Sequence, residues 1–264
     1  MNLKTMKSKA VNIKVLNIKT FNIKSIATIF ALIISGAAVA DSYQVDLGAV
    51  ASHTKLDGSD NKMKAYGLEG AYYFNPVSTI NVPLAEAAFL GKNSNVYAGA
   101  LRSSLSGEHL NFYEVGAEFY IPENFLYVNA GALRATGDNF TDNDWYTSVG
   151  ITPLDGLLVT TTYYGDEGYD ANIAAKYVMG IGGDNFINLE ARVMDADTGT
   201  VKEIGGDFYI DTTFSIGAAV SQQHSDNTYR VRTRKFFNEQ FSGELSYEDA
   251  PATNTFTAGV SVRF

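Results

Sequence analysis

Apolar and polar residues alternate along most of the chain, and the alternation is most regular in the stretch Thr255–Phe264. One face of this stretch is purely apolar, while the other carries small or polar side chains and one arginine. Strict alternation over this length predicts a β-strand whose two faces meet different environments. Aromatic residues at both ends of the apolar face are typical of a strand that crosses an outer membrane, with lipid outside and water inside. The apolar positions are Phe256, Ala258, Val260, Val262 and Phe264.

The same pattern recurs in segments of about ten residues, the length that a membrane-spanning strand needs. In the first segment Tyr43, Val45 and Leu47 share the apolar face, and Asn75-Pro76 is expected to end the second. The one clear interruption is Pro83–Leu90, where a proline precedes good helix formers. It is either a short helix at the barrel mouth or one more strand. The chain therefore predicts an antiparallel up-and-down β-barrel of 14 strands, or of 16 if this segment also spans.

The turns between the segments are of two kinds. The alternate turns are acidic and rich in glycine and asparagine, whereas the others are short and flanked by aromatic residues. This arrangement predicts a barrel with periplasmic chain ends, an aromatic girdle beside short periplasmic turns, and polar outer loops. Because all loops are short, we expect a small pore with no large loop folded inside. The aromatic pairs are Phe119 and Phe125, Tyr177 and Phe186, Tyr209 and Phe214, and Phe237 and Phe241.

The N-terminal 40 residues have a different character. Six lysines without any acid precede the apolar run Ile26–Ile34, and Ala38-Val39-Ala40 has the form of a cleavage site. These features predict a secretory signal peptide over residues 1–40, followed by the barrel over residues 41–264.

Composition narrows the possible functions further. The chain contains no cysteine, which excludes disulfides and thiolate metal sites. All 29 acids and 14 of the 20 bases follow residue 40, so the exported chain has a net charge of 14 − 29 = −15. Nucleic acid is therefore excluded as a partner. Acidic outer loops would suit lipopolysaccharide bridged by divalent cations.

Two stretches carry a resemblance to a known family. Tyr72-Tyr73-Phe74-Asn75-Pro76, followed by Val82–Leu90, resembles the putative general porin family of Gram-negative outer membranes. The resemblance implies a passive diffusion channel for small hydrophilic solutes or ions, with no cofactor, no metal and no enzymatic step. Phe264 also resembles the signal that the barrel-assembly machinery reads.

Charged residues on the predicted lumen face are the candidate site. Arg230, Arg232 and Arg234 share one face of a strand, and Glu244 and Glu248 face the same way on the next. Opposed ladders of charge would filter solutes by charge and size, with only mild cation preference because both signs are present. Alternatively, the residues pair across strands and brace the wall. Further lumen candidates are Glu69, Glu114, Glu118, Glu190, Arg192, Asp207 and Arg263.

Two other functions remain open from the sequence. A closed barrel with a structural or adhesive role would have a lumen plugged by side-chain pairs. An outer-membrane hydrolase would use His53, His109 or His224, each near a predicted outer loop. The run His224-Ser225-Asp226 is better explained as a polar turn, because a catalytic triad is defined by geometry and not by adjacency in sequence.

Overall fold

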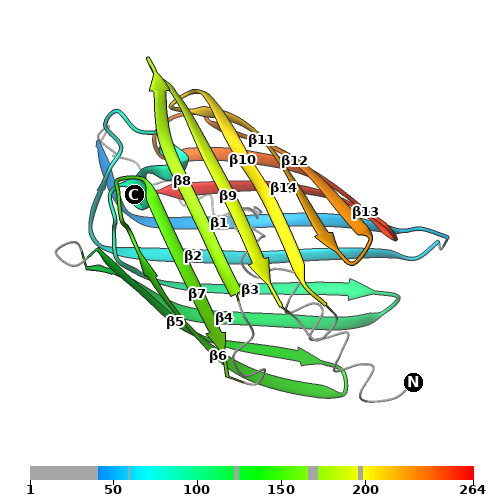
Figure 1. Cartoon of the computed structure of the whole chain (residues 1–264). Helices are drawn as coiled ribbons and strands as arrows, with labels where there is room; N and C mark the ends of the chain where they lie inside the picture. The colour runs from blue at the N-terminus through cyan, green and yellow to red at the C-terminus, as the bar shows by residue number, and fades with distance from the viewer. Residues whose placement is uncertain (1–40, 59, 122–124, 166–171, 196–198) are drawn as a thin grey trace.

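The computed structural model describes residues 41–58, 60–121, 125–165, 172–195 and 199–264. The predicted signal peptide, residues 1–40, lies outside this range. Within the described residues, fourteen antiparallel strands form one closed barrel, in which each strand pairs with its neighbours in sequence and β14 pairs with β1 (Figure 1). The predicted 14-stranded barrel is thereby confirmed.

Thirteen of the described strands have ten or more residues, enough to span a membrane when tilted, and β7 has eight. Their bounds are β1 Ser42–Leu56, β2 Lys62–Ser78, β3 Asn95–Leu105, β4 Glu108–Ile121, β5 Leu126–Gly137, β6 Phe140–Ile151, β7 Leu157–Tyr164, β8 Asn172–Gly182, β9 Asn185–Met194, β10 Val201–Asp211, β11 Phe214–Gln223, β12 Asp226–Phe236, β13 Phe241–Ala250 and β14 Thr253–Arg263.

The outer surface of the barrel is apolar, as the alternation predicts. Leu68, Val115, Trp145 and Ile204 are each more than half exposed although they lie in the middle of strands. Their sequence neighbours point inward and are small, polar or charged, because successive side chains of a strand alternate between faces. Among the described residues, no helix is long and apolar enough to cross a membrane.

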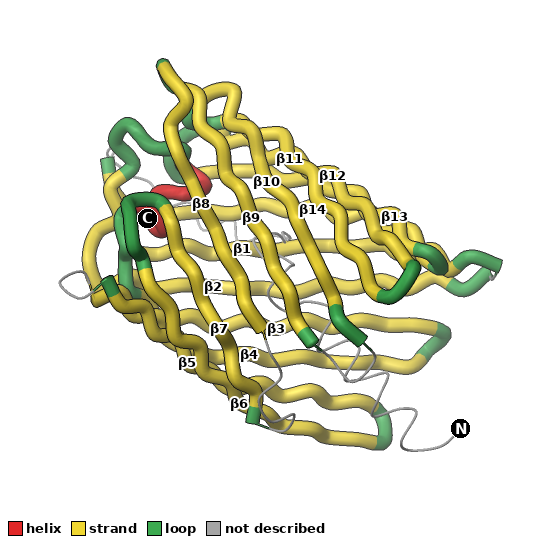
Figure 2. The backbone as a smooth tube through the Cα atoms, viewed as in Figure 1, coloured by secondary structure: helices red, strands yellow, loops and turns green. Residues whose placement is uncertain are grey.

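Leu84–Leu90, within the segment Pro83–Leu90, is helical, which decides between the two predicted strand counts. Leu84–Glu86 forms the 3-10 helix η1, and Ala87–Leu90 forms the α-helix α2. Both lie at the barrel end where β1 begins and β14 ends (Figure 2). We call this the terminal end of the barrel, and the opposite end the distal end.

The first two strands differ from the prediction at the terminal end. Tyr43 points inward and is 5% exposed, because the register of β1 against β2 shifts between Tyr43 and Val45. Its ring packs edge-on against Tyr73, with 5.6 Å between the ring centroids. Strand β2 also continues past Pro76 to Ser78. Proline is tolerated there because β2 is no longer paired with β3 beyond Tyr73, so the missing N–H breaks no ladder.

The predicted aromatic girdle is only partly present. Phe119, Phe125 and Phe237 are exposed on the outer surface by 45%, 56% and 68%. Tyr209, by contrast, points into the barrel and is 1% exposed, and Phe186 is its partner in the register. These two residues therefore line the lumen, and the prediction that they belong to the aromatic girdle was wrong.

Candidate pore

The three arginines of β12 point inward, as predicted, but each is paired. Arg230 Nη2 lies 2.6 Å from Glu248 Oε2, and Arg234 Nη2 lies 2.5 Å from Glu244 Oε2. In both cases the partner is directly opposite on β13. The side chains of Arg230 and Arg234 are 17% and 8% exposed. These pairs favour the bracing interpretation of the ladder.

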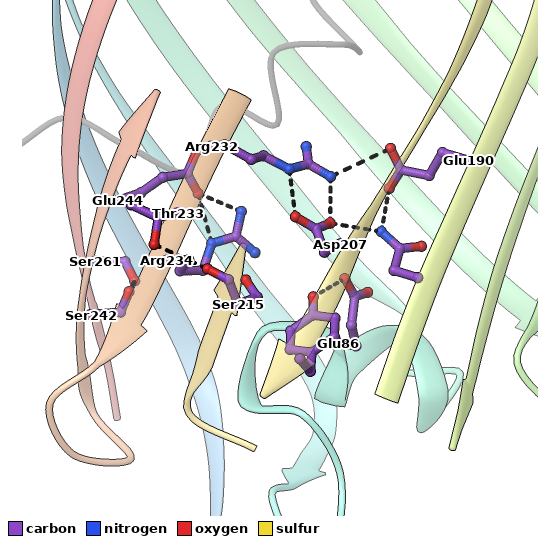
Figure 3. A network of polar contacts seen from close by, with 12 residues as sticks. Glu86, Glu190, Asp207, Ser215, Arg232, Thr233, Arg234, Ser242, Glu244 and Ser261 are labelled. Carbon is purple, nitrogen blue, oxygen red and sulfur yellow. Dashed lines mark hydrogen bonds and ion pairs between the residues drawn. The ribbon is translucent and has the colours of Figure 1, made fainter. Parts of the chain in front are cut away.

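Arg232 pairs in the other direction and reaches across a whole strand. Its Nε and Nη2 donate to the two carboxylate oxygens of Asp207 on β10, at 2.7 and 2.5 Å (Figure 3). Strand β11 lies between them and places Gly217 in register with both residues. A Cβ at Gly217 would lie 2.2 Å from Asp207 Oδ1, so the bridge depends on the glycine.

These contacts extend into one network along β8–β13. Glu190 Oε2 lies 3.7 Å from Arg232 Nη2, and Glu190 Oε1 lies 3.6 Å from Lys176 Nζ. Asn188 Nδ2 donates to both Glu190 and Asp207, at 2.8 and 3.1 Å. The network braces this side of the wall with alternating charges.

A second pair continues the network toward the distal end. The candidate Arg192 pairs with Glu203 at 2.9 Å, and Glu203 Oε1 lies 4.0 Å from Arg230 Nη1. Glu203 and Lys176 were not among the sequence candidates. Alternation could have shown the direction of Lys176. Its sequence neighbours Ala175 and Tyr177 face the lipid, so Lys176 between them points inward.

The opposite wall, β2–β6, is acidic. Glu69, Glu114 and Glu118 point inward as predicted, and Asp142 and Asp144 join them from β6. Within the described residues, the inward positions of these five strands hold no lysine or arginine. The bases of these strands all point outward: Lys62, Lys64, Arg102 and Arg134.

Two tyrosines cross part of this acidic wall. The hydroxyl groups of Tyr97 on β3 and Tyr146 on β6 hydrogen-bond to each other, and Tyr146 also donates to Glu114. The strands between them place Gly116 and Gly131 at the same level of the wall. A Cβ at Gly116 would lie 2.4 Å from the Tyr97 hydroxyl, so glycine leaves room for the ring to lie along the wall.

The connection between β2 and β3 enters the lumen at the terminal end. Glu86 is 2% exposed; it accepts a hydrogen bond from Tyr209 at 2.7 Å and pairs with Lys176 at 2.7 Å. The backbone N–H of Leu84 donates to Thr212 O at 2.8 Å. Around the ring, β10 is six strands from β2 in one direction and eight in the other.

Residues 83–90 therefore cross the terminal mouth to the far wall, and we call them the crossing segment. The expectation that no large loop folds inside does not hold for this segment. The sequence could not show this entry, because the contacts of Glu86 with Lys176 and Tyr209 join residues far apart in the chain.

Arg263 fixes the other side of the crossing segment. It is 2% exposed, donates to Asp46 at 2.9 Å and donates to Leu84 O at 2.7 Å. Its guanidinium lies 4.6 Å from the ring centroids of both Tyr43 and Phe236. This predicted lumen residue is thus an anchor for the segment.

The three histidines do not form a catalytic group. His53 on β1 and His109 on β4 point outward at one level of the wall, three strands or about 14 Å apart. His224 lies in the β11–β12 turn, against Gly199. Among the described residues, none of the three contacts another, so the geometry does not support the hydrolase alternative.

The inward charges are predominantly negative. Six bases point into the lumen from the strands: Lys176, Arg192, Arg230, Arg232, Arg234 and Arg263. Apart from Glu108 and Asp226, which are exposed beside distal turns, twelve carboxylates lie in the same space, from the strands and the crossing segment. They exceed the six bases by six negative charges among the described residues. They are Asp46, Glu69, Glu86, Glu114, Glu118, Asp142, Asp144, Glu190, Glu203, Asp207, Glu244 and Glu248.

The comparisons with known proteins agree with this geometry. A protein-family model described as "Putative general bacterial porin" matches residues 22–152 and 106–264. The solved structure of outer membrane protein Omp33 from Acinetobacter baumannii is similar with a TM-score of 0.71 and 23% identity, over 85% of this chain and 99% of that chain. It shows the same fold.

Two further solved structures are similar with lower scores. A KdgM porin in complex with disordered oligogalacturonate has a TM-score of 0.46 and 13% identity, over 82% of this chain and 99% of that chain. OprB from Pseudomonas putida, in a low-pH structure, has a TM-score of 0.46 and 11% identity, over 84% of this chain and 92% of that chain. These two add nothing to the fold assignment. A search of curated proteins found no match.

Proposed function

The chain belongs to the putative general bacterial porin family, and we propose that its lumen is a cation-preferring filter for small hydrophilic solutes. It is an outer-membrane channel for passive diffusion and not an enzyme. Membership of the family does not specify which charges a solute meets in the lumen, and these charges decide selectivity.

The excess of negative charge in the lumen carries the proposal. The inward bases of β8–β14 each have a carboxylate partner, so their fields are largely cancelled at the distance of a passing ion. The wall β2–β6 contributes carboxylates and no base among its described inward positions. Wall charges act on an ion in a confined pore over a few ångströms and are screened less than charges on the outer turns.

The candidate pore residues accordingly divide into two groups. We propose that Glu69, Glu114 and Glu118 set the preference for cations. The paired residues mainly hold the opposite wall in shape, and the crossing segment limits the size of solutes at the terminal mouth. The paired group comprises Glu190, Arg192, Arg230, Arg232, Arg234, Glu244 and Glu248.

Conductance and reversal potential in a planar bilayer test this proposal. The purified protein should form discrete channels, and a salt gradient should give a reversal potential with the sign of cation preference. Swelling of protein-containing liposomes in small sugars and in amino acids of either charge would then rank solutes. Channels with anion preference would refute the selectivity, whereas bilayers without channels would favour a closed structural barrel.

Export and assembly complete the proposed function. Residues 1–40 serve as a signal peptide for export through the periplasm, and both ends of the barrel then face the periplasm. Phe264, at the end of the last strand, engages the barrel-assembly machinery. Lipopolysaccharide contacts the acidic outer turns through divalent cations. Mass determination of the N-terminus in the outer-membrane fraction checks the first step, with Asp41 expected as the first residue.

A further inference from the structure

We infer that the outer surface of β1–β5 near the distal end is a docking surface for the phosphate groups of lipopolysaccharide. Five bases form this surface, which we call the basic face: Lys55 on β1, Lys62 and Lys64 on β2, Arg102 on β3 and Arg134 on β5. The inference rests on the outer-membrane location and adds a direct lipid contact to the cation-bridged contact of the turns.

The strand register places these residues together. Lys55 is opposite Lys62, and Tyr66, two residues from Lys64, is opposite Arg102. Arg134 is opposite Tyr113 on the next strand. All five bases alternate with inward residues and are exposed. Because neighbouring strands are about 4.8 Å apart, the basic face extends over roughly 20 Å of the barrel circumference.

The bases of the basic face are not held in ion pairs inside the described structure. None of the five makes a side-chain ion pair within the described part of the chain, although eleven ion pairs occur elsewhere in it. The outward positions of β1–β5 in the described residues also hold no aspartate or glutamate. These strand positions therefore present positive charges that no described ion pair holds, beside a β1–β2 turn that carries Asp57 and Asp60.

Their height along the barrel identifies the surroundings. Tyr66 and Tyr113 are 55% and 48% exposed and lie on the lipid side at the level of Arg102 and Arg134. Exposed tyrosines of this kind mark the boundary between acyl chains and headgroups. A cation costs much at the bilayer midplane and little at this boundary, so the basic face lies against headgroups.

The uneven distribution argues for a specific lipid. Bases that merely anchor a barrel at the interface would surround the whole ring, yet the outward strand positions of β6–β14 in the described residues carry only Lys202 and Lys235. The exported chain is strongly acidic, so a positive patch of five charges has no value for general solubility.

Phosphate is the anion that this patch fits best. Guanidinium groups bind phosphate through two hydrogen bonds, and ammonium groups add point charges around it. With the ends of the chain in the periplasm, the distal end faces outward, and the phosphorylated headgroups at that level belong to lipopolysaccharide.

The test compares phosphorylated with dephosphorylated lipopolysaccharide. The full-length barrel in detergent is titrated with each, and binding is followed by native mass spectrometry and by the rise in unfolding temperature. The double variant Lys62→Gln/Lys64→Gln removes two charges from the basic face, and Lys202→Gln/Lys235→Gln removes two from elsewhere on the outer surface. Correct folding of each is checked by heat-modifiable migration.

We expect the native protein to prefer the phosphorylated form. The first double variant should lose about tenfold or more in affinity, since each base near an anionic surface adds about a factor of five. The control variant should keep native affinity. Equal binding of both lipid forms by the native protein would refute the inference without any variant, and so would equal loss in the two variants. Equally tight binding to vesicles of phosphatidylglycerol would refute lipopolysaccharide as the partner. None of these outcomes depends on conductance, so they test the lipopolysaccharide inference independently of the proposed pore function.

Discussion

Neutralising the acidic wall should weaken the preference of the channel for cations. The triple variant Glu69→Gln/Glu114→Gln/Glu118→Gln halves the excess of six negative charges in the lumen. Glutamine keeps the length of the side chain and an oxygen that can accept the Tyr146 hydroxyl in place of Glu114. The change is therefore mainly one of charge.

Coulomb's law gives the expected size of the effect. A carboxylate about 7 Å from a passing ion contributes about 0.6 kcal/mol in water, and a Debye length of about 8 Å reduces this to about 0.25 kcal/mol. Three carboxylates then favour a cation by about 0.7 kcal/mol and disfavour an anion by a similar amount. The difference of about 1.5 kcal/mol corresponds to a change of about tenfold in the cation-to-anion permeability ratio.

Reversal potentials in a potassium chloride gradient measure that ratio directly. The matched control is Arg230→Gln/Glu248→Gln, which removes an ion pair and leaves the lumen charge unchanged. It should leave the reversal potential near the native value. An unchanged reversal potential in the triple variant would mean that these three residues do not face the conducting path. An equal shift in the control would mean that structural disturbance, and not charge, sets the ratio.

Three further predictions address the crossing segment, the lipid face and assembly. Glu86→Ala removes the contacts with Lys176 and Tyr209 and should raise single-channel conductance, whereas Lys92→Gln, which loses only an exposed pair with Asp155, should not. Leu189→Arg should destabilise the barrel by about 2–4 kcal/mol in a folding titration if it is near the midplane, while Ser221→Arg on the lumen face should cost little. Deletion of Phe264 should lower the outer-membrane level and the heat-modifiable fraction, and normal values of both would contradict a role in assembly.

The contacts of Asn188 change what facing alone would predict for an arginine in its place. Facing alone suggested that arginine at Asn188 would be harmless, because Asn188 points into the lumen. The structure makes it 1% exposed and gives it hydrogen bonds to Glu190 and Asp207. Arginine there would break the network, so lumen facing does not by itself mean tolerance.

The fold could be predicted from the sequence because every strand of a membrane barrel has an apolar face toward lipid and a polar or small face toward the lumen. The alternation around Leu68 or Val115 has a period of two, and the strand register cannot slip without moving the apolar set inward. The inward direction of Arg230, Arg232 and Arg234 followed from the same rule. Local pattern was sufficient for these features since each depends on one strand and its environment.

Features that depend on departures from the period were missed. Tyr43 changes face because of a register shift that leaves no mark in the alternation. Tyr209 appeared to belong to the outer girdle because it flanks a short turn, but its hydroxyl satisfies the buried Glu86 instead. In both cases tertiary contacts at the terminal end, which include the crossing segment, override the local signal.

The sequence did not show which charges in the lumen are paired, and this pairing decides the field in the pore. Arg230 and Arg234 could be paired with Glu248 and Glu244 from strand order alone, whereas the bridge from Arg232 to Asp207 required the intervening Gly217 to be in register with both. Once each arginine has a carboxylate partner, a count of arginines overstates the positive field in the pore. The field that an ion meets is set by the carboxylates that remain on the other wall, which is why a strand with three arginines can belong to a channel that favours cations.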